Sequence, residues 1–184
     1  MALNSSVRRS PGLRSAQDSA VLVPVPEAAP LVGPHRLRLD PNAAAGVPEH
    51  ITLISPFVPP DRLDAGVRGR LAALFARARP FPFQLTSVGW FGDEVMWLAP
   101  EPADPFLELT ELLVAEFGIP PYEGAYADIR PHLSVALGNP EGGREVADSI
   151  SARLPICAVA DRVQLMVGAE ATGWSVLEEY RLGG

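Results

Sequence analysis

Two segments of the chain, VPEHITLISPF and IRPHLSVALGNP, repeat one pattern of residue types. In each, a proline precedes a histidine, and then come an apolar residue, a hydroxyl residue and more apolar residues. We call His50-x-Thr52 the first motif and His132-x-Ser134 the second motif. Alternate side chains of a strand share a face, so the histidine and the hydroxyl of each motif point the same way. A strand motif that occurs once in each half of a chain predicts two similar lobes.

The remaining apolar patterns predict strands that adjoin helices, with hairpins among them, which is typical of an α+β fold. Strands are expected over 19–27, 49–54 and 132–138, in both arms of a hairpin at 81–101 that turns at Gly92–Asp93, and as two strands within 156–183. Helices are expected over 62–78, 104–118 and 140–155, with Asp61 and Asp104 as N-caps, and a further one within 28–41 is interrupted at Gly33 and Pro34. The hairpin aromatics Trp90, Phe91 and Trp97 are expected to pack in the core.

The domain organisation follows from length and local composition. Residues 1–18 are rich in Ser and Arg without periodicity, so we expect them to form a disordered leader. Residues 19–184 are expected to form a single domain, which is long enough to bury a substantial core.

Charge and composition restrict the partners. The chain has a net charge of −7, so a broad surface for long duplex nucleic acid is not expected. All fifteen of its Lys and Arg residues are Arg. No segment is apolar enough to span a membrane, and we expect a cytoplasmic protein. The single cysteine, Cys157, lies in an apolar run and is expected to be buried. We expect a monomer that carries no cofactor.

Two imidazoles and two hydroxyls that face each other suit an in-line displacement at a phosphodiester. Unperturbed histidine titrates near pH 6.5, so one ring can act as a base while the other acts as an acid. The hydroxyls of Thr52 and Ser134 would donate hydrogen bonds to the non-bridging phosphate oxygens. No Asp, Glu or Cys pattern supplies the further ligands that a metal would need beside His50 and His132, so no metal is expected.

The two motifs resemble those of the 2H phosphoesterase superfamily, in particular its 2′–5′ RNA ligase-like branch. The likeness in the order of strands and helices covers about residues 19–182. The resemblance implies an α+β fold in which two antiparallel-rich sheets with flanking helices form two lobes related by a pseudo-twofold axis around a central cleft. It also implies activity on 2′,3′-cyclic phosphates or related RNA-end or nucleotide phosphodiesters, without a metal, with His50 and His132 as the catalytic pair.

Four residues near the motifs are candidates for lining the substrate: Phe57, Tyr122, Tyr126 and Arg130. Core packing is the competing interpretation for Phe57, and solvation at the surface is the competing one for Arg130. His35, the third histidine, lacks the motif and is expected at the surface or beside a helix.

Two other functions are compatible with the same residues. The chain could bind a phosphate or an RNA end without catalysis, or it could be a reversible 2′–5′ RNA ligase. The acidic composition favours a small nucleotide or an RNA end as the substrate. The sequence leaves open which histidine is the base.

Overall fold

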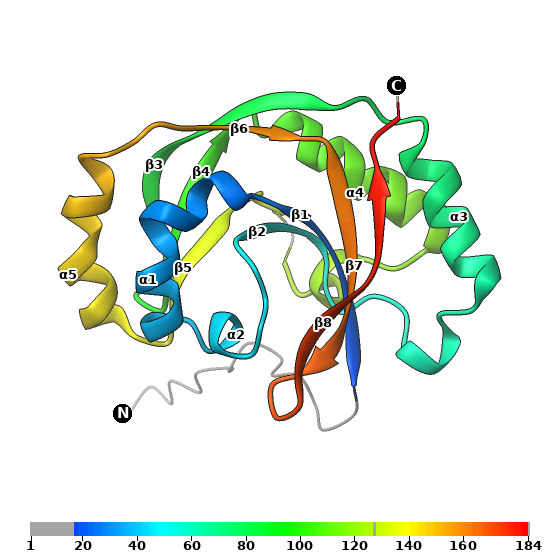
Figure 1. Ribbon diagram of the computed structural model, residues 1–184, viewed down its shortest axis with the longest axis horizontal. Helices are drawn as coiled ribbons and strands as arrows, with labels where there is room; N and C mark the ends of the chain where they lie inside the picture. Colours follow the sequence, from blue (N-terminus) through cyan, green and yellow to red (C-terminus); the bar gives the residue numbers. More distant parts are fainter. Residues whose placement is uncertain (1–16, 127, 184) are drawn as a thin grey trace, which may run out of the picture.

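The computed structural model describes residues 17–126 and 128–183, which form two antiparallel four-stranded sheets (Figure 1). In spatial order, sheet A consists of β2 (His50–Ile54), β1 (Asp18–Pro24), β7 (Arg162–Ala169) and β8 (Gly173–Arg181). Sheet B consists of β5 (Leu133–Leu137), β4 (Val95–Glu101), β3 (Phe81–Phe91) and β6 (Ile156–Ala160). The predicted α+β class and its two sheets are confirmed.

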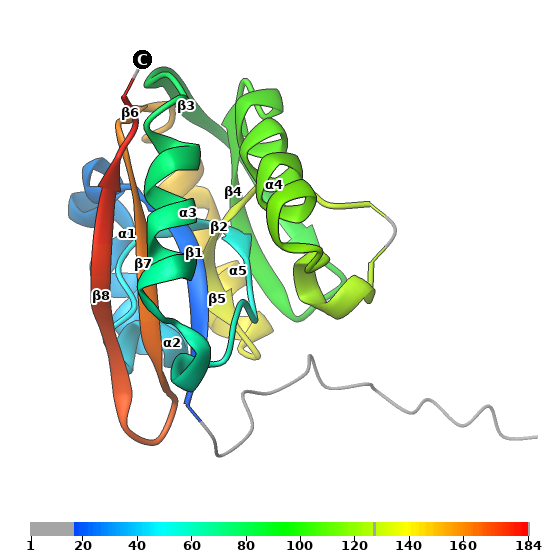
Figure 2. The ribbon, with the colours of Figure 1, turned by 90° about the vertical axis from the view of Figure 1, so that its right-hand side faces the viewer.

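Helices flank the sheets at both ends of the molecule in Figure 1, with α1 and α5 at one end and α3 and α4 at the other. The α-helices are α1 (Ala29–Leu39), α2 (Pro41–Ala44), α3 (Ala65–Phe75), α4 (Asp104–Phe117) and α5 (Pro140–Ser151). Short 3-10 helices are η1 (Pro26–Ala28), η2 (Pro60–Arg62) and η3 (Pro121–Gly124). Figure 2 shows α3 and α4 side-on, with sheet A beside α3 and the β3–β4 hairpin beside α4.

The helices pack crosswise between the two lobes. Helix α1 precedes β2 in the chain but packs on β5, whereas α4 precedes β5 but packs on β2. The hydroxyl of Thr110 on α4 donates a 3.3 Å hydrogen bond to the carbonyl of Leu53 on β2. Because of this exchange, β2 and β5, each at one edge of its sheet, contact one another, and we call the junction between these two strands the seam.

One hydrophobic core extends across both sheets. It contains side chains from both sheets, such as Val21 and Leu165 of sheet A and Leu85 and Leu98 of sheet B. The helices contribute their apolar faces to this core, which explains why short, Gly- and Pro-containing segments remain helical.

Three helix boundaries differ from the sequence prediction. Helix α1 continues through Gly33 and Pro34, because its buried face, which includes Val32 and Leu39, is held in the core. The N-cap of α3 is Asp64 rather than Asp61, and its carboxylate accepts a 2.8 Å hydrogen bond from the amide of Val67. Helix α4 has no side-chain cap, because Asp104 is its first residue and the N-cap is Ala103.

The C-terminal quarter of the chain contains three strands rather than the predicted two. A run that looked like one strand passes from β6 in sheet B to β7 in sheet A at Asp161 (Figure 1). On β6, Ala158 and Ala160 face the core while Cys157 is exposed, so the predicted burial of Cys157 is wrong. The apolar run suggested that Cys157 is buried, but the small residues Ala158 and Ala160 fill the inner face of this edge strand and Cys157 lies on the other face.

The expected leader lies outside the described residues up to position 16. The first strand, expected from residue 19, begins at Asp18.

Candidate active site

The two motifs lie at the seam, the first on edge strand β2 and the second at the start of edge strand β5. On β2, Ile51 and Leu53 are buried whereas His50 and Thr52 are half-buried, so the two motif side chains share the outer face. His50 pairs with Pro24, and Thr52 with Leu22, on β1.

The second motif repeats this alternation in the other sheet. Leu133 and Val135 are buried, and Ser134 is half-buried and pairs with Trp97 on β4. His132 is half-buried as well and comes immediately before β5. Both histidine–hydroxyl pairs therefore lie on the less buried face of their segments at the junction of the two sheets.

The two imidazoles are held by the same hydrogen bond. His50 Nδ1 lies 2.7 Å from the carbonyl oxygen of Pro48, and His132 Nδ1 lies 2.7 Å from the carbonyl oxygen of Arg130. A carbonyl only accepts, so Nδ1 carries the proton in both rings. When a ring is neutral, its Nε2 has a free lone pair, and when the ring is charged, Nε2 is a proton donor. Each ring is thus oriented to take or give a proton through Nε2.

Burial disfavours the charged form of both rings. The pKa of His50 is lowered to about 4, mainly by burial, then by the positive charge of Arg36 and, least of all, by a charge on His132. The hydrogen bond to Pro48 and the charge of Asp40 act in the opposite direction. Burial also lowers the pKa of His132, although its hydrogen bond to Arg130 opposes the shift.

A buried ion cluster lies behind the first motif. The side chain of Arg36, 1% exposed, contacts a carboxylate oxygen of Asp40 at 2.8 Å and one of Glu49 at 3.7 Å. Its guanidinium also donates a 3.4 Å hydrogen bond to the carbonyl of Val47. Sequence reasoning did not find Arg36. The only signal was the i, i+4 spacing of Arg36 and Asp40, which is also common on exposed helix faces.

Aromatic rings surround the second motif instead. Phe91 meets the ring of His132 edge-on at a centroid distance of 4.8 Å, and Trp97 lies 6.0 Å away. Phe91 also stacks on Trp97 at 4.9 Å. The indole of Trp97 lies over Gly89, where a Cβ atom would collide with it, so this cross-strand glycine permits the indole position. Trp97 packs in the core as expected, at 6% exposure, but it also frames the histidine.

Three of the four candidate lining residues lie near the motifs. Arg130 supplies the carbonyl that holds His132, and its guanidinium lies 5.8 Å from the centre of the Trp97 ring. Burial raises the pKa of Tyr122 to about 12, its neighbour Tyr126 adds to that rise, and a hydrogen bond to the Thr52 side chain opposes it. Tyr126 meets Tyr122 edge-on at 5.7 Å and is 53% exposed.

The structure does not bring Phe57 to the motif side chains. It is 5% exposed and packs edge-on against Phe117 at 5.0 Å, within the core. His35 is half-buried and lies within α1.

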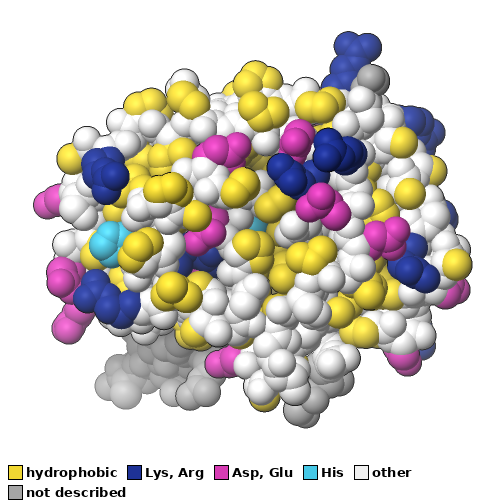
Figure 3. All heavy atoms as spheres, viewed as in Figure 1, with side chains coloured by type: hydrophobic (Ala, Val, Ile, Leu, Met, Phe, Trp, Pro, Cys, Tyr) yellow, Lys and Arg dark blue, Asp and Glu magenta, His cyan; other side chains and the backbone are white. Residues whose placement is uncertain are grey.

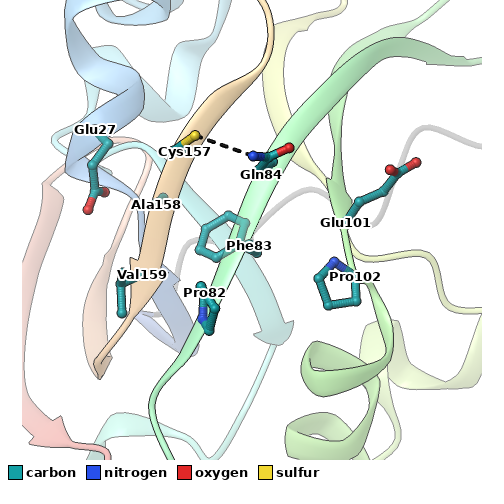
Figure 4. Close-up of a pocket in the computed structure, with 9 residues that line it drawn as sticks. All are labelled: Glu27, Pro82, Phe83, Gln84, Glu101, Pro102, Cys157, Ala158 and Val159. Atoms are coloured by element: carbon teal, nitrogen blue, oxygen red, sulfur yellow. Dashed lines mark hydrogen bonds between the residues drawn. The ribbon is translucent and has the colours of Figure 1, made fainter.

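Other surfaces of the molecule differ from the seam. An open hollow of about 530 Å³ lies over β3 and β6, where Cys157 accepts a 3.4 Å hydrogen bond from Gln84 (Figure 4). On the described surface shown in Figure 3, acidic, basic and apolar side chains are interspersed, without a continuous basic area.

Within residues 17–126 and 128–183, no three or more His, Cys, Asp or Glu residues are grouped as metal ligands would be. In the same residues, no helix has the length and apolar character needed to cross a bilayer.

Solved structures share this architecture. E. coli LigT, in a crystal structure with 3′-AMP, superposes with a TM-score of 0.57 over 91% of this chain and 99% of its own, at 18% identity. A Thermus thermophilus protein superposes with a TM-score of 0.58 over 91% of this chain and 98% of its own, at 20% identity. At these identities the likeness concerns the fold.

Sequence relatives extend the likeness. A Bacillus cereus protein that is provisionally named a phosphoesterase is 30% identical over 80% of this chain and 86% of its own length. A Bacillus licheniformis protein with the same provisional name is 28% identical over 89% of this chain and 96% of its own. The sequence profile of the 2′-5′ RNA ligase superfamily matches residues 24–172, which include both motifs. The chain belongs to the 2′-5′ RNA ligase superfamily, the 2H phosphoesterases.

Proposed function

We propose that the protein is a phosphodiesterase that opens 2′,3′-cyclic phosphates, or related phosphodiesters at RNA ends or in nucleotides, by two-histidine acid–base catalysis. The observation that carries this proposal is the matched pair of hydrogen bonds, 2.7 Å each, that fixes the Nδ1 proton of His50 and of His132. Two rings with the same tautomer, on edge strands that meet at the seam, supply one base and one acid to a single phosphate.

The net reaction adds one water molecule to the cyclic phosphate. One imidazole takes a proton from water through Nε2 while the water oxygen forms a bond to phosphorus. The bond from phosphorus to one ribose oxygen breaks, and the other imidazolium gives its Nε2 proton to that leaving oxygen. The product is a ribose phosphomonoester, and solvent returns both histidines to their starting charges.

The hydroxyls of Thr52 and Ser134 complete the site. Each follows its histidine by two residues on the same face, which supports a role as donor of hydrogen bonds to the non-bridging oxygens, where negative charge must be stabilised. The family relationship supports this arrangement. E. coli LigT has been crystallised with 3′-AMP and with phosphate, and the former is a phosphomonoester of the kind that opening a cyclic phosphate yields.

The test is hydrolysis of 2′,3′-cyclic nucleotides with EDTA present. We expect turnover by the wild type, and a loss of about 10²–10⁴-fold in kcat for His50→Ala and for His132→Ala. His35→Ala is the matched control, since this third histidine lies outside both motifs, and it should retain full activity. Unchanged turnover in either motif variant would exclude the two-histidine mechanism.

The same preparations distinguish the other activities. Binding of a cyclic nucleotide without turnover by the wild type would identify a phosphate-binding module. Joining of an RNA end bearing a 2′,3′-cyclic phosphate to one with a free 5′-hydroxyl would show the ligase reaction. A protein that makes only hydrolysis products under both conditions is the phosphodiesterase that we propose.

A further inference from the structure

The Arg36 side chain is linked to the segment that orients His50. Its guanidinium donates to the carbonyl of Val47 at 3.4 Å and contacts the carboxylate of Glu49 at 3.7 Å. Between these two residues lies Pro48, whose carbonyl holds the Nδ1 proton of His50. Arg36 therefore fixes both chain neighbours of the group that orients the imidazole.

Arg36 is itself held firmly. It is 1% exposed, and its closest partner is Asp40, four residues later, at 2.8 Å. Asp40 is anchored in turn, because it accepts a 3.0 Å hydrogen bond from the amide of Asn42 at the start of α2. A buried guanidinium with several fixed partners has little freedom to move away from the histidine.

The second motif has a different environment. The ring of His132 lies against the rings of Phe91 and Trp97. The guanidinium of Arg130 lies over the ring of Trp97 and belongs to an exposed residue. A buried positive charge beside one ring, and aromatic rings beside the other, give the two histidines different tendencies to carry a proton.

We propose that Arg36 is a positioning residue that holds His50 oriented and neutral, as a general base requires, and so leaves the role of acid to His132. The catalytic part of this inference rests on the proposed function. The positive charge of Arg36 is the second cause, after burial, of the low pKa of His50. A phosphate anion bound at the seam would favour the charged form of His132, the form that donates a proton.

The groups around His50 come from several elements. Arg36 on α1 and His132 disfavour its charged form, and Asp40 after α1 favours it. Glu49 precedes it on the chain and pairs with Arg36. On η3 the ionisable neighbour is Tyr122, beside Thr52, and α4 contributes the uncharged Thr110. Among these groups, Arg36 has the largest electrostatic effect on His50.

The experiment is an NMR titration of the imidazoles of His50 and His132 in the full chain. In Arg36→Gln we expect the pKa of His50 to rise by about one unit or more, with a much smaller change at His132. Arg38→Gln is the matched control, because Arg38 lies on the same helix but is exposed and pairs with Glu145 at 3.9 Å. It should leave both titrations unchanged.

A second variant guards against loss of folding, since removing one partner of a buried ion pair is strongly destabilising. Arg36→Gln/Asp40→Asn removes both charges, and asparagine also caps a helix well, so α2 keeps its N-cap. The pKa of His50 should again rise, because Arg36 affects it more strongly than Asp40 does. An unchanged titration of His50 in a folded variant, or an equal change in Arg38→Gln, would overturn the inference.

Kinetics then tests the catalytic part. The ascending limb of kcat/KM against pH should move to higher pH in Arg36→Gln, in step with the titration of His50. If the pKa of His50 rises but the ascending limb stays where it was, His50 is not the base. If the wild type hydrolyses no cyclic phosphate at any pH, the proposed function fails, while the titration still decides whether Arg36 sets the charge of His50.

Discussion

His50 and His132 are held by the same hydrogen bond but are surrounded by different chemistry. Behind His50 lies a buried ion cluster of Arg36, Asp40 and Glu49, whereas His132 lies against the rings of Phe91 and Trp97. Orientation of the rings is therefore common to the two motifs, and the environment that sets their charge is not. A duplicated motif can keep the geometry that catalysis requires while its two copies take different parts in proton transfer.

The largest expected effect of this difference is on the dependence of kcat/KM on pH in the His50→Ala and His132→Ala variants. The wild type should show kcat/KM rising through about pH 4, as His50 loses its proton, and falling above the lowered pKa of His132. His50→Ala should remove the rising limb and His132→Ala the falling limb, each with a loss in kcat of about 10²–10⁴-fold. Measurement of kcat/KM from about pH 3 to pH 9 decides it, because that range spans the rising limb near pH 4. Exchanged limbs would mean exchanged roles.

Substitution of Thr52 and Ser134 tests the hydroxyl group that the two motifs share. Thr52→Val and Ser134→Ala should each lower kcat about 10²-fold, because each removes one donor to the non-bridging oxygens. Thr52→Ser and Ser134→Thr keep the hydroxyl and should retain most of the activity. A large loss from one removal and none from the other, in steady-state assays of all four variants, would show that only one motif holds the phosphate.

Stability against pH tests the first motif without a substrate. In the folded state the pKa of His50 is about 4, against about 6.5 in an unfolded chain, so the unfolded state binds more protons between these values. The free energy of unfolding should therefore fall by up to about 3 kcal/mol as the pH drops from 6.5 to 4. Urea unfolding should show that His50→Gln lacks this part of the decrease, whereas His35→Ala keeps it. Parallel curves for His50→Gln and the wild type would contradict the lowered pKa.

The smallest effect tests the second motif alone. Gly89→Ala should displace the indole of Trp97, which frames His132, and lower kcat by at most about 10-fold. The NMR titration of His50 should not change. Gly69→Ala is the control, because a Cβ there meets no atom within 4 Å. A shift at His50 in Gly89→Ala would show that the two environments are coupled.

The sequence predicted what depends on local pattern. Strand alternation placed His50 and Thr52 on one face of β2, and the burial of Ile51 and Leu53 on the other face confirms that alternation. The hairpin turn at Gly92 followed from turn chemistry, and Gly92 has a positive φ of 55°. The repeat of the motif indicated the family, although the roles of the site residues remain predictions.

What was missed depends on tertiary contacts. Arg36 and Arg38 look alike in the sequence, yet one is 1% exposed and the other 55%, because only the first is directed into the fold. The passage of the chain between sheets at Asp161 was missed for a similar reason. The apolar pattern continues across that residue, and only the packing of the two sheets separates β6 from β7.

The crossing of the chain from sheet B to sheet A at Asp161 affects the order in which the two sheets form. In sheet B, β4 pairs with β3 and β5, the strands before and after it in the chain. These three strands, of which β5 carries Ser134, can therefore assemble once residue 137 has been synthesised. Sheet A cannot do this, because β1 lies between β2 and β7, and β7 begins only at Arg162. Until then β2 belongs to a two-stranded ribbon, which is marginally stable in water. During translation, the strand that carries His50 emerges first but is the later of the two to gain its finished sheet.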